Sequence, residues 1–151
     1  MATKKILITG GAGYIGSHTC VELLNAGHEL VVVDNLSNST FEALARVQRI
    51  TGRVLTFHRV DLRDKPALRA VFALYDIEAV IHFAGLKAVG ESVQHPLRYY
   101  DHNVGGAVAL CEVMAEFAVN RLVFSSSATV YGEPDVMPIR EDFPVGGTTN
   151  P

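Results

Sequence analysis

Four glycines within seven residues, directly after a short apolar run, constrain the fold of this chain more than any other feature. The run is Lys5–Thr9, and Gly11, Gly13 and Gly16 then form the pattern G-x-G-x-x-G. Gly10, Gly13 and Gly16 also form the related pattern G-x-x-G-x-x-G. Between a strand and a helix, such glycines permit a tight turn, close approach of the backbone to a pyrophosphate, and close packing of helix on strand. The motif therefore predicts a dinucleotide-binding site, with the phosphates at the helix N-terminus.

An acidic residue follows where such a site requires one. Asp34 ends the second apolar run, 18 residues after Gly16, and a carboxylate there accepts hydrogen bonds from the adenosine ribose. Because it repels a 2′-phosphate, Asp34 favours NAD over NADP. The alternative is that Asp34 only caps a turn. The order of strand, glycine turn, helix, strand and acid favours the dinucleotide interpretation.

Short aliphatic runs alternate with helix-like segments along the chain. The runs are uniformly apolar, which indicates burial on both faces, as in a parallel sheet covered by helices. Strands that alternate with helices form βαβ units with right-handed crossovers. We therefore expect one α/β domain over residues 1–151, a doubly wound, Rossmann-like parallel sheet of about five strands. The expected strands are 5–9, 30–33, 54–58, 79–83 and 121–125, and the expected helices are 14–26, 41–50, 64–74 and 96–117.

The first and last of these helices allow more detailed predictions. In the first, Ile15, Thr19 and Leu23 fall near one face, which predicts that this face is buried. In the last, the pair Gly105-Gly106 costs helix stability, about 1 kcal/mol for each glycine relative to alanine. Such a cost predicts close packing or a kink at that point.

Composition excludes several classes of protein. Of 151 residues, 48% are apolar and 19% are charged, which suits a folded core and not a disordered chain. The net charge of −3, without a block of like charges, offers no basic surface for nucleic acid or a membrane. No apolar run is long enough to span a bilayer or serve as a secretory signal. Two cysteines in helix-like segments suit a reducing, cytoplasmic compartment. Six histidines without ligand spacing predict no metal site, and His82 is expected to be a satisfied core residue.

Two further stretches make the sequence recognisable. Together with the glycine turn and the pair Asp34-Asn35, the stretches 83–92 (FAGLKAVGES) and 125–132 (SSSATVYG) resemble the extended short-chain dehydrogenase/reductase family. Within it, the resemblance is to the members that interconvert UDP-glucose and UDP-galactose through a 4-keto intermediate with bound NAD. It implies an isomerase of galactose metabolism that acts on a UDP-hexose and forms a homodimer when full length.

The resemblance also assigns roles to individual residues. Lys87 and Ser127 would contact the sugar, and Ser127 would be the catalytic serine that hydrogen-bonds the 4-hydroxyl and helps it lose its proton. Asp61 would accept a hydrogen bond from the adenine amino group. Asn103 is similar to the family's structural asparagine, whereas His102 stands where many such epimerases have asparagine. The implied cofactor-binding residues are Gly10, Gly13, Tyr14, Ile15, Gly16, Asp34, Asn35, Asn38, Ser39, Asp61, Leu62, Phe83, Ala84, Gly85, Lys87 and Asn103.

Part of that family's machinery is missing from these 151 residues. The family's base is the tyrosine of a Tyr-x-x-x-Lys motif, and no tyrosine of this chain has lysine four positions later. We therefore expect a truncated chain, cut directly before this motif and without the substrate domain. It should be inactive alone and should associate through uncovered apolar surface. Two alternatives stay open: an epimerase or reductase of another nucleotide sugar, and an NAD-binding module without catalysis.

Overall fold

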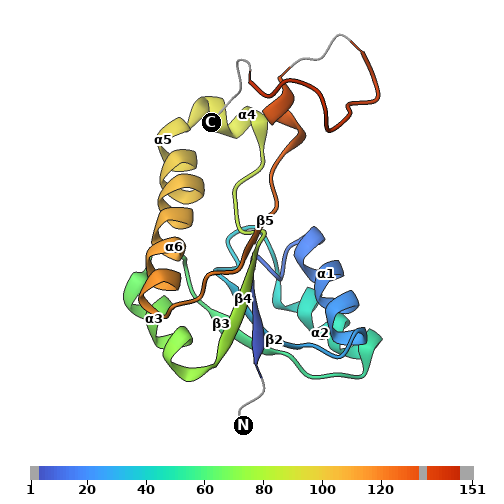
Figure 1. The fold of residues 1–151 in the computed structure, drawn as a ribbon, viewed down its shortest axis with the longest axis vertical. Coiled ribbons are helices and arrows are strands. Elements are labelled where there is room, and N and C mark those ends of the chain that lie inside the picture. The colour runs from blue at the N-terminus through green and yellow to red at the C-terminus, as the bar shows by residue number, and fades with distance from the viewer. Residues whose placement is uncertain (1–3, 133–135, 147–151) are drawn as a thin grey trace.

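A sheet of five parallel strands forms the centre of the molecule (Figure 1). The computed structural model describes residues 4–132 and 136–146. The strand order is β3-β2-β1-β4-β5, so the winding direction reverses between β1 and β4, and this confirms the expected doubly wound α/β fold. The strands are β1 Lys5–Thr9, β2 Glu29–Asp34, β3 Thr56–Arg59, β4 Ile77–His82 and β5 Leu122–Phe124.

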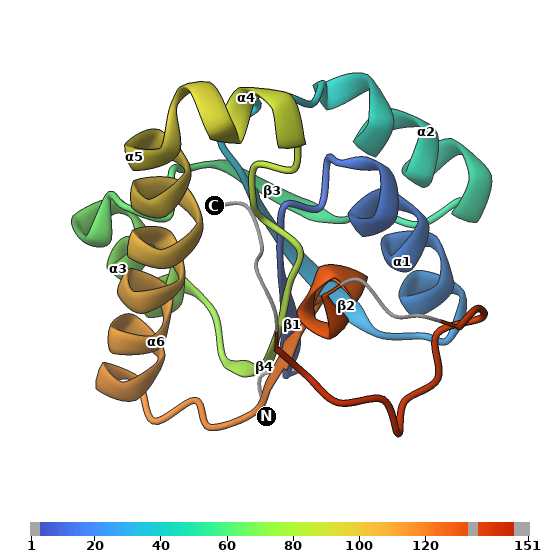
Figure 2. The ribbon, with the colours of Figure 1, turned by 90° about the horizontal axis from the view of Figure 1, so that it is seen from above.

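Helices cover both faces of the sheet, as the view from above shows (Figure 2). Leu7 belongs to the core cluster beneath α3 and α6, and its neighbour Ile8 belongs to the cluster beneath α1 and α2. Adjacent residues of a strand thus enter opposite cores, which explains why the strands are apolar without alternation. The helices are α1 Tyr14–Asn25, α2 Phe41–Thr51, α3 Lys65–Leu74, α4 Val89–Gln94, α5 Pro96–Tyr99, the π-helix η1 Tyr100–Gly105, α6 Gly106–Glu116 and the 3-10 helix η2 Ala128–Tyr131.

The buried face of α1 differs from the predicted one. Ile15 is exposed, and the buried residues are Gly16, Cys20 and Leu24. The cause lies at Gly16, where a Cβ would be only 2.3 Å from the Gly10 carbonyl oxygen. The close approach of helix and turn at Gly16 turns this side of α1 toward the sheet, so the face is offset by one residue.

The predicted helix over residues 96–117 is one continuous helical stretch, but a π-helical segment interrupts its α-helical geometry. The segment η1 ends at Gly105, and a Cβ at Gly106 would lie 3.6 Å from the Leu62 side chain. The expectation of an irregularity or close packing at these glycines is confirmed. The short helix α4 was not predicted, because six residues that include Gly90 carry no readable helical period.

The last strand is the least covered part of the sheet. Leu122, Val123 and Phe124 are exposed by 40%, 61% and 57%, although each aligns with a residue of β4. Exposed apolar surface on the sheet agrees with the expectation from the sequence, and the expected association through it stays a prediction. None of the described helices is both long and apolar enough to cross a membrane.

Candidate functional site

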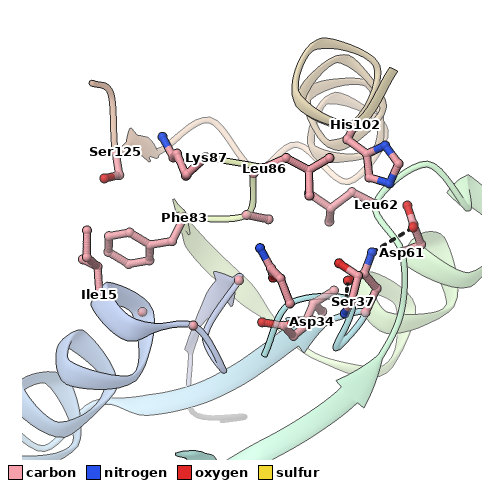
Figure 3. Close-up of a pocket in the computed structure, with 18 of the residues that line it drawn as sticks. Ile15, Asp34, Ser37, Asp61, Leu62, Phe83, Leu86, Lys87, His102 and Ser125 are labelled. Atoms are coloured by element: carbon pink, nitrogen blue, oxygen red, sulfur yellow. Dashed lines mark hydrogen bonds between the residues drawn. The ribbon is translucent and has the colours of Figure 1, made fainter. Parts of the chain in front are cut away.

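A cleft of about 340 Å³ opens at the carboxyl ends of β1, β2 and β4, where the winding reverses. Open α/β sheets hold their ligands at this switch point. Figure 3 shows Asp61 and His102 toward one end of the cleft, and Ser125 and Phe83 toward the other. The lining residues are Gly10, Gly13, Tyr14, Ile15, Gly16, Val33, Asp34, Asn35, Ser37, Asn38, Val60, Asp61, Leu62, Phe83, Ala84, Gly85, Leu86, Lys87, His102, Ser125 and Ser126.

The glycines of the turn differ in what surrounds them. Gly10 has a φ of +67°, and a Cβ there would lie 2.6 Å from the backbone nitrogen of Ala84. Gly16 is closed off in the same way by the Gly10 carbonyl. At Gly13 the same carbonyl oxygen, 3.2 Å away, is the one atom of the described residues, apart from the neighbours in the chain, within 4 Å of the Cβ position. Gly10 and Gly16 therefore serve packing, whereas Gly13 leaves its backbone open to a ligand in the cleft.

The N-terminus of α1 presents free backbone donors at this point. Its N-cap is Gly13, which supplies no side-chain cap, and its first turn contains no acidic residue. The first bond of the helix runs from the Ser17 amide to the Gly13 carbonyl, so the amides of Tyr14, Ile15 and Gly16 have no partner within the helix. Together with the helix dipole, these amides suit an anionic group such as phosphate.

Asp34 closes the floor of the cleft at the end of β2. Its buried carboxylate accepts hydrogen bonds from the Ala12 amide at 3.0 Å, the Leu36 amide at 2.8 Å and the Ser39 hydroxyl at 2.9 Å. A carboxylate offers about four acceptor positions, so one position is left among the contacts of the described residues. Asp34 therefore fixes the glycine turn to β2 and can still accept from a ligand hydroxyl.

Asp61 lies at the other end of the cleft, two residues beyond β3. Both of its oxygens accept from the guanidinium of Arg63, at 2.9 and 2.8 Å, and Asn35 donates to one of them at 2.9 Å. The bonds from Arg63 hold the pKa of the Asp61 carboxyl far below its ordinary value, and the bond from Asn35 adds to this. Asp61 is therefore an ionised acceptor at any physiological pH.

His82 supports the end of β4 from within the core. The ring nitrogen Nδ1 lies 2.6 Å from the Thr9 hydroxyl, and the ring packs 5.4 Å from that of Phe124. Burial, followed by the charge of Lys87, lowers the pKa of His82. The prediction of a satisfied core histidine is confirmed.

Asn103 positions the segment that leaves β4. Its side-chain oxygen accepts from the Leu86 amide at 2.8 Å, and its side-chain nitrogen donates to the Leu86 carbonyl at 3.0 Å. Two bonds to the backbone of one residue, on the peptide units either side of its Cα, fix the chain next to Gly85, which lines the cleft. Asn103 thus acts on the site through the backbone of Leu86 and not as a lining residue.

The predicted site residues gather in one place with three exceptions. Ser39 and Asn103 do not line the cleft and act through Asp34 and Leu86. Ser127 was placed at the end of the fifth strand, but β5 ends at Phe124 and Ser127 is the exposed N-cap of η2. Its hydroxyl oxygen accepts from the Thr129 hydroxyl at 2.9 Å. The lining residues that sequence reasoning did not assign are Val33, Ser37, Val60, Leu86, His102, Ser125 and Ser126.

Most of these missed residues adjoin predicted ones in the sequence. Val33 precedes Asp34 and Val60 precedes Asp61, so their position at strand ends was an available signal. Arg63 does not line the cleft but bonds to Asp61, which does. No local sequence pattern indicates this contact, so sequence reasoning could not have found it. Among the described residues, no three His, Cys, Asp or Glu side chains gather as metal ligands would.

The fold, the glycine turn and the acidic residue at the end of β2 together define a class of protein. The chain belongs to the NAD dependent epimerase/dehydratase family, which it matches over residues 6–151. This confirms the resemblance read from the sequence motifs.

Comparison with individual proteins narrows the likeness. The UDP-glucose 4-epimerase of Bacillus subtilis (strain 168) is 66% identical over 143 residues, which are 95% of this chain and 42% of that protein. The crystal structure of UDP-glucose 4-epimerase from Bifidobacterium longum in complex with NAD+ and UDP superposes with a TM-score of 0.94 at 51% identity, over 98% of this chain and 44% of that one. The crystal structure of UDP-glucose-4-epimerase from Stenotrophomonas maltophila, with bound NAD and formylated UDP-arabinopyranose, superposes with a TM-score of 0.91 at 49% identity. The match covers 97% of this chain and 44% of that one. The chain thus spans less than half the length of these relatives.

Proposed function

We propose that the chain binds NAD in the cleft and forms the cofactor-binding part of an epimerase that interconverts UDP-glucose and UDP-galactose. The observation that supports this best is the geometry around the glycine turn. The open backbone at Gly13 lies between the uncapped amides of α1 and the remaining acceptor position of Asp34. One cleft therefore offers a phosphate site beside a ribose-hydroxyl acceptor.

The rest of the cofactor then follows the length of the cleft. Asp61 at one end, with Leu62 beside it, would hold the adenine, with the carboxylate accepting from the 6-amino group. The β4 end, from Phe83 to Lys87, would line the central part, and the segment after β5 would meet the reacting end. The donors, acceptors and bare backbone present in this structure fit a dinucleotide.

In the whole enzyme, bound NAD would supply the hydride acceptor for C4 of the hexose. In this chain, Lys87 and Ser127 would position the sugar, with Ser127 holding its 4-hydroxyl. Two relatives that are named UDP-glucose 4-epimerase have different molecules bound beside NAD: one holds UDP, and the other holds a formylated UDP-arabinopyranose. A different nucleotide sugar as substrate therefore stays the alternative.

We further propose that the enzyme works as a homodimer in the cytoplasm. The stretch α5–η1–α6 carries exposed apolar residues at helical spacing, Leu97, Tyr100, Val104 and Val108, here called the apolar stripe. A continuous apolar strip of this kind on one helix supports association. Both cysteines are free, as is usual for proteins of a reducing compartment.

Calorimetry with the 151-residue chain tests cofactor binding. We expect saturable binding of NAD and at least roughly tenfold weaker binding of NADP, because the Asp34 carboxylate repels a 2′-phosphate. Asp34→Asn should weaken NAD about tenfold and narrow this preference, since the charge is lost while an acceptor for the Ala12 and Leu36 amides is kept in part. Asp142→Asn, which removes a carboxylate paired with Arg140 outside the cleft, should change neither value. Equal affinity for NAD and NADP, or no NAD binding by a chain whose circular dichroism shows a folded state, would contradict the proposal.

The second prediction concerns turnover by the isolated chain. No tyrosine within these 151 residues has the partner lysine of the family's base, so the 4-hydroxyl proton has no acceptor of that kind. We expect negligible conversion of UDP-galactose to UDP-glucose in a coupled steady-state assay. Turnover close to that of an intact epimerase would show that the chain contains a base of its own.

A further inference from the structure

Arg63 lies beside the cleft, and its guanidinium bonds to carboxylates of two separate segments of the chain. It stands outside the lining residues, at the turn between β3 and α3, yet its guanidinium reaches back to Asp61, which lines the cleft. The same guanidinium donates to Asp101 in η1 through its remaining terminal nitrogen. One side chain therefore connects the loop after β3 with the π-helical segment across 38 positions of sequence.

The carboxylate of Asp61 is fully supplied with donors by this arrangement. Arg63 gives three of them: its backbone amide at 3.0 Å, and Nε and Nη2 at 2.9 and 2.8 Å. The fourth is the side-chain amide of Asn35, at 2.9 Å (dashed in Figure 3). With about four acceptor positions on a carboxylate, a ligand donor that reaches Asp61 must replace one of these four.

Asn35 is the donor that can give way. The three bonds from Arg63 come from a residue two positions away, and its two side-chain bonds form a charge-assisted fork, which is stronger than a neutral amide bond. The Asn35 amide is neutral and comes from the loop after β2. Exchange of this amide for a ligand amino group leaves the carboxylate in place, with Arg63 still holding it.

His102 takes no part in this arrangement as a hydrogen-bond acceptor. Its Nδ1 lies 2.8 Å from the Arg98 carbonyl oxygen and 3.3 Å from Nη1 of Arg63. A carbonyl oxygen can only accept, so Nδ1 carries the proton and donates to it. Asp101 is therefore the partner that anchors the free end of the Arg63 guanidinium.

We propose that Arg63 is a positioning residue, which fixes the ionised Asp61 as an acceptor and so makes the cleft selective for a purine that carries a 6-amino group. The inference rests on the proposed binding of NAD. Adenine presents a donor at position 6, whereas hypoxanthine presents a carbonyl oxygen, which a fixed carboxylate repels. Removing the guanidinium frees the Asp61 side chain to turn away, and the difference between the two bases is then lost.

The test compares two dinucleotides on the folded 151-residue chain by calorimetry: NAD and its deaminated analogue, nicotinamide hypoxanthine dinucleotide. The wild-type chain should bind NAD roughly tenfold to a hundredfold more tightly. Arg63→Gln should bring this ratio close to one, mainly through weaker NAD binding. Arg63→Lys keeps the charge without the fork, so an intermediate ratio is expected from a variant that preserves the fold.

Arg69→Gln is the matched control. Arg69 also makes a two-point pair with a carboxylate, that of Glu116, and its side chain is about as exposed as that of Arg63, but it stands outside the cleft lining. Its ratio should equal that of the wild-type chain. If Arg63→Gln weakens both dinucleotides equally, or if the wild-type chain binds both with the same affinity, Arg63 has no role in selectivity while the proposed NAD site stands. If the folded wild-type chain binds neither, the proposed function fails, and this inference with it.

Discussion

Replacing Gly10 with alanine is expected to lower the free energy of unfolding by about 4 kcal/mol, which leaves little of a typical domain's stability. Two costs combine. A non-glycine residue at a φ of +67° loses roughly 1–2 kcal/mol. The new Cβ would also lie 2.6 Å from the Ala84 nitrogen and 2.7 Å from its Cα. These backbone atoms follow β4 directly, where the Ala84 amide donates to the Thr9 hydroxyl, so relief of the contact costs about 1–3 kcal/mol more.

Gly52→Ala separates the two costs. Gly52 follows α2 with a nearly identical φ of +63°, and beyond its neighbours in the chain no atom of residues 4–132 and 136–146 lies within 4 Å of its Cβ position. Its replacement should cost only about 1–2 kcal/mol, the conformational part. Urea unfolding followed by circular dichroism measures both variants. Equal losses at the two positions would show that the close approach of Ala84 to the Gly10 Cβ position adds no cost of its own.

A charged double substitution in the apolar stripe is expected to weaken self-association of the chain about a hundredfold. Val104 in η1 and Val108 in α6 are exposed by 54% and 50%, and α6 lies on the opposite side of the molecule from α1 and α2 (Figure 1). Each valine is already about half buried, so its burial in an interface contributes roughly 0.75 kcal/mol, half the value for a fully exposed valine. A homodimer buries two valines from each protomer, and the resulting total of about 3 kcal/mol corresponds to two decades in the dissociation constant. Sedimentation should therefore detect oligomers of the wild-type chain that Val104→Lys with Val108→Lys dissociates.

The control moves the same substitution to another exposed apolar pair. Ile50 and Val54, near the end of α2, are exposed by 69% and 85%, and their replacement by lysine adds the same charge without touching the stripe. This variant should associate as the wild-type chain does. A wild-type chain that sediments as a monomer at all concentrations would contradict association through the stripe. If both double variants dissociate equally, net charge and not the stripe governs association.

Much of the fold was readable from the sequence because its signals are local. The five strands are runs of apolar residues, and the helix expected over 64–74 is present as α3, with Asp64 as the N-cap that accepts from the Ala67 amide. The first strand has the predicted ends, and the ends of the other four moved by one or two residues, since hydrogen bonding between strands, and not composition, decides where pairing stops. In α1, the first residue of the buried face was predicted to be Ile15 but is Gly16. The count of apolar positions missed it because glycine has no side chain to contribute to the pattern.

The sequence by itself determined the order of the elements, the glycine turn and the acidic residue that ends β2. Each depends on residues close together in the chain, whose backbone preferences and apolar period act wherever the segment lies. The tertiary structure alone decided that Asn103 holds the Leu86 peptide, that Arg63 joins Asp61 to Asp101, and that Ala84 leaves no room for a side chain at Gly10. These contacts join elements 17 to 74 positions apart, and only the packing of helices on the sheet sets the distances between them.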